Sequence, residues 1–402
     1  MEQSLGLEEI KAARAAIAEI IRVTPTRYSR SISQMTGYPV HFKLECHQKT
    51  GSFKLRGAAN RILNILPDCP GVIAASAGNH AQGVAYAASQ LGLKSTIVMP
   101  EGAPLTKAEA TRNYGAHVIQ QGNNYDECYQ VAVELAAEQK LEYIHAFDDK
   151  RIIAGQGTIG LELLEQLPEV EQVVVPIGGG GLAAGIASAL KAMKPSVRLV
   201  GVQAQGADAV YRSFLGGQLT ESQATSTIAD GIAVKRPGKV TSKLLLEHLD
   251  AVVTVSDEQI ASAMLLSLER LKTLVEGAGA VGLAAALYQP ESMKPVPTAI
   301  VVSGGNVDVN LIARIIERGL HETGRLATLQ LTIPDRPGNL QKVLNIVAKL
   351  GANVISVTHD RHQEGLALDW TQVTMSLETK NQEHIDKLIQ ALTNSGLKVK
   401  NI

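Results

Sequence analysis

The chain has 402 residues, of which 45% are hydrophobic, 19% charged and only 3% aromatic. At roughly 150 residues per domain, this length allows two or three domains that each bury a core. The 38 basic side chains nearly balance the 39 acidic ones, and the resulting net charge of −1 argues against a nucleic-acid-binding protein. The sequence lacks a stretch of 18 consecutive apolar residues, which argues against a membrane span.

The cysteine pattern and the N-terminal sequence indicate the cellular compartment. The three cysteines are odd in number, widely spaced and not arranged as C-x-x-C, so a disulfide framework and a structural zinc site are both unexpected: Cys46, Cys69 and Cys128. The sequence begins with a charged helical pattern rather than the basic and apolar regions of a signal peptide. Together these features predict a cytoplasmic protein.

In the first 322 residues, short β-branched runs alternate with longer helical patterns. The runs are continuously apolar, which is typical of strands covered on both faces. Alternation of strands and helices predicts a parallel α/β sheet. The predicted strands are 72–75, 96–99, 117–119, 173–175, 198–202, 252–255 and 299–302.

The pattern changes after residue 322. Residues 323–328 read as a polar linker, and the segment 329–402 follows the order β-α-β-β-α-β, which is the ferredoxin-like arrangement. Its predicted strands and helices are 329–334, 339–350, 354–358, 371–377, 382–392 and 397–402. The sequence therefore predicts a catalytic region over 1–322 and a second domain of another class over 329–402.

Four segments carry groups suited to chemistry. In the first, Lys54 follows Gly51-Ser52-Phe53 and precedes Gly57. A solvated lysine at a helix start is the ordinary interpretation of such a residue. The alternative is a Schiff-base lysine, whose partial burial lowers the amine pKa and makes it nucleophilic.

Two further segments are turns between a strand and a helix, where helix N-termini favour anions. Ser76-Ala77-Gly78-Asn79-His80 suits a carboxylate, although a plain asparagine cap explains it equally well. The run Gly178-Gly179-Gly180-Gly181 is costly in chain entropy and lets several backbone N–H groups approach a phosphate closely. It lacks the Lys-Ser/Thr of a P-loop, and Gln203 stands where a dinucleotide site needs an acidic residue.

The fourth segment places Ser303 at a strand end before Gly304-Gly305-Asn306. One ligand would use all four segments, with an aldehyde for Lys54, a phosphate for the glycine run and a ring for Phe53 and Ser303. Pyridoxal phosphate has these three parts.

With these motifs in this order, the chain resembles the threonine ammonia-lyases (threonine dehydratases) of the tryptophan-synthase-β-like, fold-type-II pyridoxal-phosphate enzymes. The matching motifs are Ser52-Phe53-Lys54-x-Arg56-Gly57-Ala58, Ser76-x-Gly78-Asn79-His80, Gly178 to Gly181, Ser303-Gly304-Gly305-Asn306 and Ile228-Ala229-Asp230-Gly231. The resemblance implies a two-lobed catalytic region, with a small lobe of roughly residues 50–150 inserted in the large lobe. It also implies that the tail is an ACT regulatory domain.

The resemblance assigns a role to each matching residue. Lys54 would hold the cofactor as a Schiff base and act as the base at Cα, and Phe53 would pack against the ring. Asn79 would bind the phenolic oxygen and Ser303 the pyridine nitrogen, while the phosphate would lie on Gly178, Gly179, Gly180 and Gly181. The substrate carboxylate would lie against Ser76, Ala77, Gly78 and His80. The implied reaction is β-elimination from L-threonine, giving 2-oxobutanoate and ammonia, with L-serine as a second substrate.

Other reactions on the same scaffold remain alternatives. Serine racemases carry a serine where this chain has Ala77, so racemisation should be poor here. β-Replacement enzymes usually show Asn-Thr or a similar pair where this chain has Asn79-His80. Glu276 either faces the substrate or merely begins a helix, and the binding of a cation near Ala229 is open. An amino-acid sensor with an inactive catalytic region is the remaining, weaker alternative.

The tail carries a possible effector site. The resemblance implies that Gly338 and Asn353 lie near an amino-acid effector bound where two ACT domains pair their sheets edge to edge, as exposed strand edges favour. It therefore predicts a homodimer or homotetramer. Isoleucine, valine and AMP are candidate effectors, and the sequence does not choose among them.

Overall fold

The computed structural model describes residues 5–222, 225–363 and 365–402. The chain divides into two compact units, Met1–Val307 and Asp308–Ile402, and each is described by itself. Within the described residues, we find no helix long and apolar enough to cross a membrane.

The larger sheet of the first unit has, among the described residues, six strands in the order β1-β2-β10-β7-β8-β9. All neighbouring strands are parallel except β1 and β2. The parallel arrangement predicted from the apolar runs is therefore confirmed. The strands are β1 (Thr26–Tyr28), β2 (Val40–Leu44), β7 (Gln172–Pro176), β8 (Arg198–Ala204), β9 (Ala251–Val255) and β10 (Thr298–Val302).

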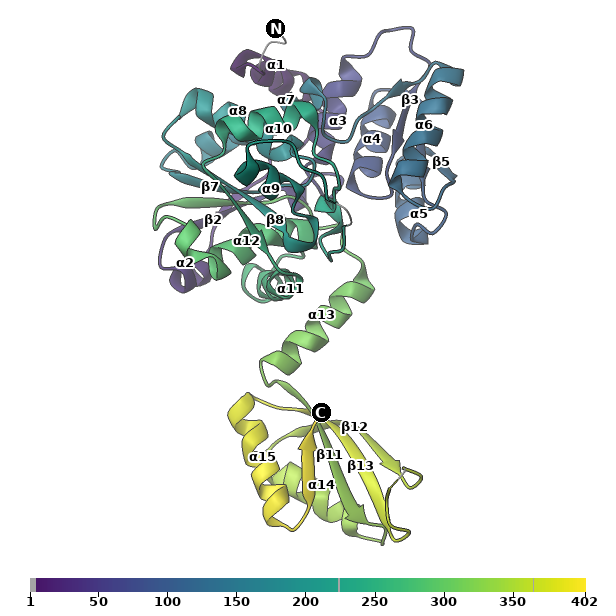
Figure 1. Cartoon of the computed structure of the whole chain (residues 1–402), viewed down its shortest axis with the longest axis vertical. Coiled ribbons are helices and arrows are strands. Elements are labelled where there is room, and N and C mark those ends of the chain that lie inside the picture. Colours follow the sequence, from purple (N-terminus) through teal and green to yellow (C-terminus); the bar gives the residue numbers. More distant parts are fainter. Residues whose placement is uncertain (1–4, 223–224, 364) are drawn as a thin grey trace. The chain divides into compact units, whose positions relative to one another are not determined.

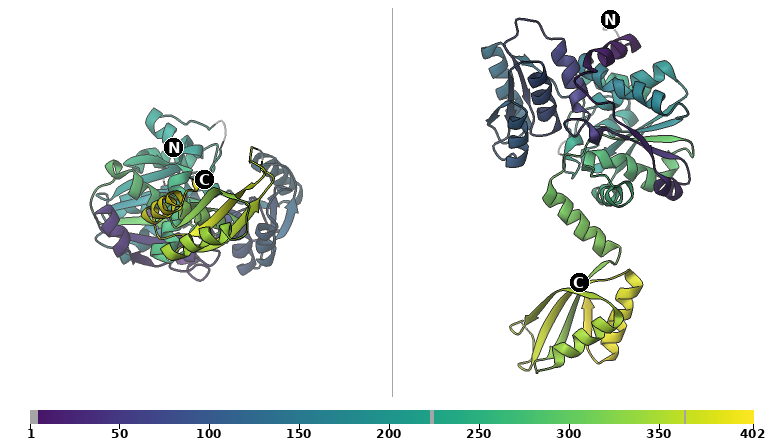
Figure 2. Two further views of the ribbon diagram at one scale, coloured as in Figure 1. Left: turned by 90° about the horizontal axis from the view of Figure 1, so that it is seen from below. Right: turned by 180° about the vertical axis from the view of Figure 1, so that it is seen from behind.

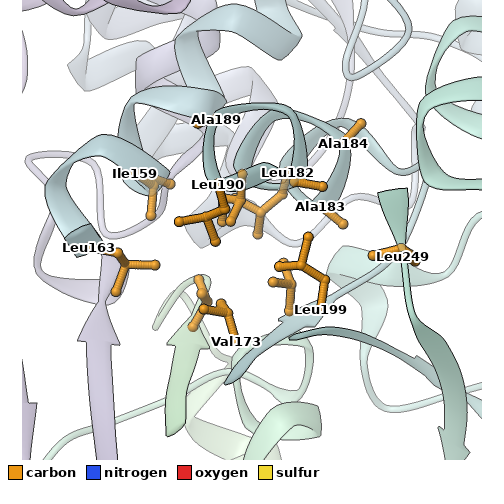
Figure 3. Packing of buried hydrophobic residues seen from close by; sticks show 14 of the residues in the cluster. Ile159, Leu163, Val173, Leu182, Ala183, Ala184, Ala189, Leu190, Leu199 and Leu249 are labelled. Carbon is orange, nitrogen blue, oxygen red and sulfur yellow. The ribbon is translucent and has the colours of Figure 1, made fainter. Parts of the chain in front are cut away.

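Helices cover both faces of this sheet (Figure 1). Along β7, Val173 and Val175 belong to the same core cluster as the apolar residues of α7 and α8, and Val174 faces α12 at Gly282. Figure 3 shows Ile159, Leu163 and Leu190 packed above Val173. The helices are α1 (Leu7–Ile17), α2 (Arg30–Thr36), α7 (Lys150–Gln166), α8 (Gly181–Met193), α9 (Ala209–Gly216), α10 (Lys239–His248), α11 (Asp257–Leu266) and α12 (Gly277–Tyr288).

A smaller parallel sheet lies within the same unit, in the order β5-β4-β3-β6. It is sandwiched between α4, which shares one core cluster with α3, and α6, whose Cys128 and Ala132 pack under Ile73 and Val98. Its elements are α3 (Lys54–Leu63), β3 (Val72–Ala75), α4 (Asn79–Gln90), β4 (Ser95–Met99), α5 (Leu105–Asn113), β5 (His117–Gln120), α6 (Tyr125–Gln139) and β6 (Glu142–Tyr143).

The second unit has the expected β-α-β-β-α-β order, and its antiparallel sheet runs β12-β13-β11-β14. Side chains of β11 alternate between buried and half-buried, and α14 and α15 lie on one face of the sheet (Figure 2). The elements are α13 (Val309–Glu322), β11 (Leu326–Pro334), α14 (Asn339–Leu350), β12 (Asn353–Asp360), β13 (Trp370–Glu378), α15 (Gln382–Asn394) and β14 (Lys398–Asn401).

Two boundaries differ from the sequence-based ones. The helix α13, which the sequence analysis includes in the catalytic region, packs against β11 and is grouped with the second unit. The strand β11 begins at Leu326, within the predicted linker 323–328. The linker is therefore shorter than the polar composition of the segment indicates.

Candidate active site

The loop that leads to Lys54 is joined to the turn after β10. Ser52 forms an isolated antiparallel bridge with Gly304, and the backbone N–H of Phe53 donates to the Ser303 carbonyl over 3.0 Å. The N–H of Gly305 donates to the Gly51 carbonyl over 2.9 Å. Two of the predicted motifs, distant in sequence, therefore lie side by side.

Lys54 is the first residue of α3, and its amine is nearly enclosed by protein. Nζ donates to the Ala146 carbonyl over 2.9 Å and lies 5.3 Å from the centre of the Phe53 ring. Burial lowers the pKa of the Lys54 amine to about 8, against the attraction of the Glu276 carboxylate. A lysine with a lowered pKa is more often neutral, and only the neutral amine can attack a carbonyl or accept a proton.

Three hydroxyl groups near Lys54 are buried without a protein partner. Ser303 is 2% exposed, and its Oγ accepts or donates no hydrogen bond in the part of the chain that the structure describes. The hydroxyls of Ser52 and Thr50 are in the same condition across those residues. Because an unsatisfied buried polar group is costly, such a cluster is suited to a polar ligand.

The glycine run links β7 to α8. Gly180 precedes the helix with φ +95°, and a Cβ at Gly179 would overlap the ring of Phe147. The Thr241 hydroxyl donates to the Gly179 carbonyl over 2.7 Å and fixes the turn. Backbone N–H groups at the first turn of a helix have no intrahelical acceptor, so they are available to a phosphate.

The second predicted cradle links β3 to α4. Ser76 Oγ accepts from the Gly78 N–H over 3.1 Å, and α4 begins at Asn79. The ring of His80 is buried, and its Nε2 lies 2.9 Å from the Ile144 carbonyl, so Nε2 carries the hydrogen. Burial, assisted by the charge of Lys54, lowers the pKa of His80 to about 3. The imidazole is therefore neutral, and only the backbone N–H of His80 is suited to an anion.

Glu276 is a site residue whose role the sequence left undecided. It precedes α12, is 3% exposed, and both carboxylate oxygens accept from Asn79 Nδ2, over 2.8 and 3.0 Å. Burial raises the pKa of the Glu276 carboxyl to about 7, although the hydrogen bond from Asn79 lowers it. The helix-start interpretation and the site interpretation are thus both correct for this residue.

A second buried polar group lies under α3, and we call Arg56, Glu45, Glu162 and Lys43 the Arg56 cluster. Arg56 Nε lies 2.8 Å from Glu45 Oε2, and Nη1 lies 2.6 Å from Glu162 Oε1. Lys43 Nζ lies 2.5 Å from Glu162 Oε2, and these side chains are at most 1% exposed. Arg56 belongs to a predicted motif, but the sequence analysis gave it no role.

In the second unit, Gly338 precedes α14 with φ +86°, and Asn353 begins β12, where its Nδ2 donates to Glu378 over 3.3 Å. Pro334 at the end of β11 pairs with Trp370, whereas Asn353 pairs with Glu378 at the other end of β13. The two predicted effector residues therefore lie at opposite ends of the sheet in one chain. In the described residues, we find no group of three or more His, Cys, Asp or Glu suited to a metal ion.

Comparison with known proteins agrees with this geometry. The profile of the pyridoxal-phosphate dependent enzymes matches residues 17–304, and that of the ACT domain matches residues 322–396. The chain is 45% identical to the L-threonine ammonia-lyase of Thermotoga maritima over 398 residues, covering 98% of this chain and 99% of that protein.

Two solved structures show the same fold. A threonine deaminase from the organism abbreviated T.th. is 41% identical, with a TM-score of 0.73 over 75% of this chain and 99% of that one. The serine racemase of maize is 38% identical, with a TM-score of 0.75 over 80% of this chain and 99% of that one.

Proposed function

Because the chain belongs to the family of pyridoxal-phosphate-dependent enzymes, we propose that it converts L-threonine to 2-oxobutanoate and ammonia, and L-serine to pyruvate and ammonia. The relative from Thermotoga maritima, similar over nearly its whole length, carries the name of this activity. The observation that carries the proposal is the half-buried Lys54 amine beside the unpartnered hydroxyl of Ser303.

The residues present fit the cofactor. Lys54 would bind its aldehyde, Phe53 would contact its ring, Asn79 its phenolic oxygen and Ser303 its pyridine nitrogen. The phosphate would lie on the N–H groups of Gly178, Gly179, Gly180 and Gly181, where Gly179 leaves no room for a side chain. When bound, pyridoxal phosphate supplies an electron sink for the bond electrons at the substrate Cα.

The chain's own residues then bind substrate and move protons. The turn Ser76, Ala77, Gly78 and the N–H of His80 would hold the substrate carboxylate, and neutral Lys54 Nζ would take the Cα proton. Ser303 offers a hydroxyl rather than a carboxylate, so it does not keep the pyridine nitrogen protonated. The resulting weaker sink favours early loss of the β-hydroxyl.

Serine racemisation is the second candidate, because a serine racemase is among the similar structures. Racemisation needs a proton donor on the face opposite Lys54, and Ala77 has no proton to give. We therefore expect negligible D-serine. A β-replacement enzyme, in contrast, would need an added thiol before it released product.

The experiment incubates the holoenzyme with L-threonine or L-serine, without a thiol, and measures 2-oxo acid and D-serine. We expect 2-oxo acid from both substrates, with the extra methyl of threonine changing kcat/KM by about 10- to 200-fold. Lys54→Ala should lower the rate by about 10³-fold or more, since it removes both the cofactor attachment and the base. Lys49→Ala, on an exposed lysine nearby, is the control. D-serine formed as fast as pyruvate would overturn the proposal.

We further propose that residues 329–402, after the linker, form the regulatory domain of a cytoplasmic homodimer or homotetramer. All eight residues of the edge strand β12 are exposed. If β12 paired antiparallel with β12 of a second copy, the partner's Asn353 would reach the end of the sheet that holds Gly338. An amino-acid effector would then bind between copies, which explains why one chain keeps the two residues apart.

This regulation is tested with isoleucine and valine on the full chain. We expect Asn353→Ala to lower effector affinity and the response of the reaction to the effector, with the basal rate unchanged. A response that survives the substitution, or a monomer in sedimentation, would refute the shared site.

A further inference from the structure

Asn79 lies in a hydrogen-bonded cluster built from four distant segments. Its Oδ1 accepts from Asn306 Nδ2 over 2.8 Å, and its Nδ2 donates to the two oxygens of Glu276. Asn306 Nδ2 also donates to the Thr50 carbonyl over 2.8 Å. The cluster therefore spans the loop before Lys54, the start of α4, the start of α12 and the turn after β10.

These contacts fix which way the Asn79 amide faces. A carboxylate and a carbonyl only accept, so the amide nitrogens of Asn79 and Asn306 must face Glu276 and Thr50 respectively. A flipped Asn79 would set its oxygen against the Glu276 carboxylate and its nitrogen against the nitrogen of Asn306. Both ends of the amide thus select the same orientation.

The selected orientation leaves a donor unused. Asn79 Nδ2 carries two hydrogens, and the two Glu276 oxygens lie close enough to share one of them. The second N–H can donate to a ligand. Glu276 needs space for this contact, and Gly304 provides it, because a Cβ there would overlap Glu276 Oε1.

We propose that Glu276 and Asn306 are positioning residues that hold Asn79 as a hydrogen-bond donor toward the phenolic oxygen of pyridoxal phosphate. The inference rests on the proposed function, since it needs the cofactor at Lys54. Neither Glu276 nor Asn306 has to touch the substrate for this role. Lys54, Asp230 and Lys107 are the other charged groups whose fields act on or respond to Glu276.

The test reads the cofactor without substrate. Pyridoxal phosphate is titrated into cofactor-free protein, and its dissociation constant and absorbance maximum are measured for Asn79→Ala, Glu276→Ala and the double variant. Each single variant should weaken binding by about 10- to 100-fold and shift the absorbance maximum, because an oriented donor is lost. The double variant should bind no worse than Asn79→Ala alone.

Two further variants keep the test decisive. Asn306→Ala should reproduce the absorbance shift and also show no added effect on Asn79→Ala, so the test stands if Glu276→Ala fails to fold. Asp250→Asn is the matched control, since Asp250 accepts from the Leu199 N–H and from Lys191 at the opposite, amino-terminal edge of the sheet. It should leave cofactor binding unchanged.

The outcomes separate the two claims. Additive losses in the double variants, or an unshifted absorbance maximum, would refute the positioning role even if the protein deaminates threonine. If the wild-type chain bound cofactor normally but released no 2-oxo acid, the proposed reaction would fail while the positioning role could still hold.

Discussion

Two buried polar groups lie close together in the first unit and differ in how their charges are compensated. In the Arg56 cluster, burial opposes the charge of Arg56 and Glu45, yet their ion pairs raise the pKa of Arg56 and lower that of Glu45. At Lys54 and Glu276, burial dominates, so the pKa of the amine falls to about 8 and that of the carboxyl rises to about 7. Two residues along α3 separate these opposite results.

The difference teaches how a site can be distinguished from a structural ion pair. Buried charges that are fully paired stabilise one arrangement and have no capacity left for a ligand. Partly compensated groups, with unpartnered hydroxyls beside them, cost stability in the cofactor-free protein and are available for binding. Substitutions in the two groups should therefore have opposite effects on stability.

The largest expected effect is in the Arg56 cluster. Arg56→Met leaves Glu45 buried without its guanidinium, which should cost about 3–5 kcal/mol of unfolding free energy. Urea unfolding of the cofactor-free protein measures this loss. Arg212→Met, which breaks the partly exposed pair with Asp208, is the control and should cost less than about 1 kcal/mol. A loss for Arg56→Met as small as the control would remove the contrast.

Glu276 should produce the next largest effect, and it depends on pH. Its pKa is raised in the folded chain, so the stability linked to its proton is complete below pH 4.5 and is lost as the pH rises through about 7. Glu276→Gln does not titrate. Relative to the wild type, it should therefore gain about 3 kcal/mol of unfolding free energy between pH 4.5 and about pH 8.

Urea unfolding of the cofactor-free forms across that pH range measures the gain. Asp250→Asn is again the control, because the pKa of Asp250 lies below its ordinary value and its titration is complete before this range begins. A pH-independent difference between Glu276→Gln and the wild type would contradict the raised pKa.

Lys54 should show a gain where a buried lysine of the other cluster shows a loss. Below about pH 8 the protonated Lys54 amine is destabilised by burial, so Lys54→Met should stabilise the cofactor-free protein by about 2 kcal/mol at pH 7. The gain should fade as the pH rises from 8 towards 10.5, where the neutral amine is already favoured.

Lys43→Met serves as the comparison, because Lys43 Nζ donates to Glu162 and to the Thr24 carbonyl. This substitution should destabilise the protein. If thermal unfolding showed the two methionine variants to lose stability equally, Lys54 would be as well compensated as Lys43.

The same contrast explains what the sequence could predict. Parallel strands and the β-α-β-β-α-β domain follow from local apolar patterns, and the structure confirms both. The strand β2 was not identified because His41 and Lys43 interrupt its apolar pattern. Lys43 is buried only because Glu162, 119 residues away, pairs with it, and no local pattern contains that information.

For the site, the glycine run and the residues around Lys54 were recognisable as motifs. Glu276 was undecided, since its contact with Asn79 joins positions 197 residues apart in the sequence. The His80 ring was expected near the substrate carboxylate, and only the fold shows that it binds the Ile144 carbonyl. Local sequence therefore predicts which turns carry the chemistry, and the tertiary contacts decide which side chains face it.

The smallest expected effect concerns two buried serines. Ser303 Oγ has no partner among residues 5–222, 225–363 and 365–402, whereas Ser188 Oγ donates to the Ala184 carbonyl over 2.8 Å. Ser303→Ala removes an unsatisfied group and should stabilise the cofactor-free protein by about 1 kcal/mol, while Ser188→Ala should destabilise it by a similar amount. With pyridoxal phosphate present, the sign for Ser303→Ala should reverse, because the hydroxyl then has a partner. Thermal unfolding with and without the cofactor measures both signs, and a Ser303→Ala variant that ignores the cofactor would show that this hydroxyl is not part of its site.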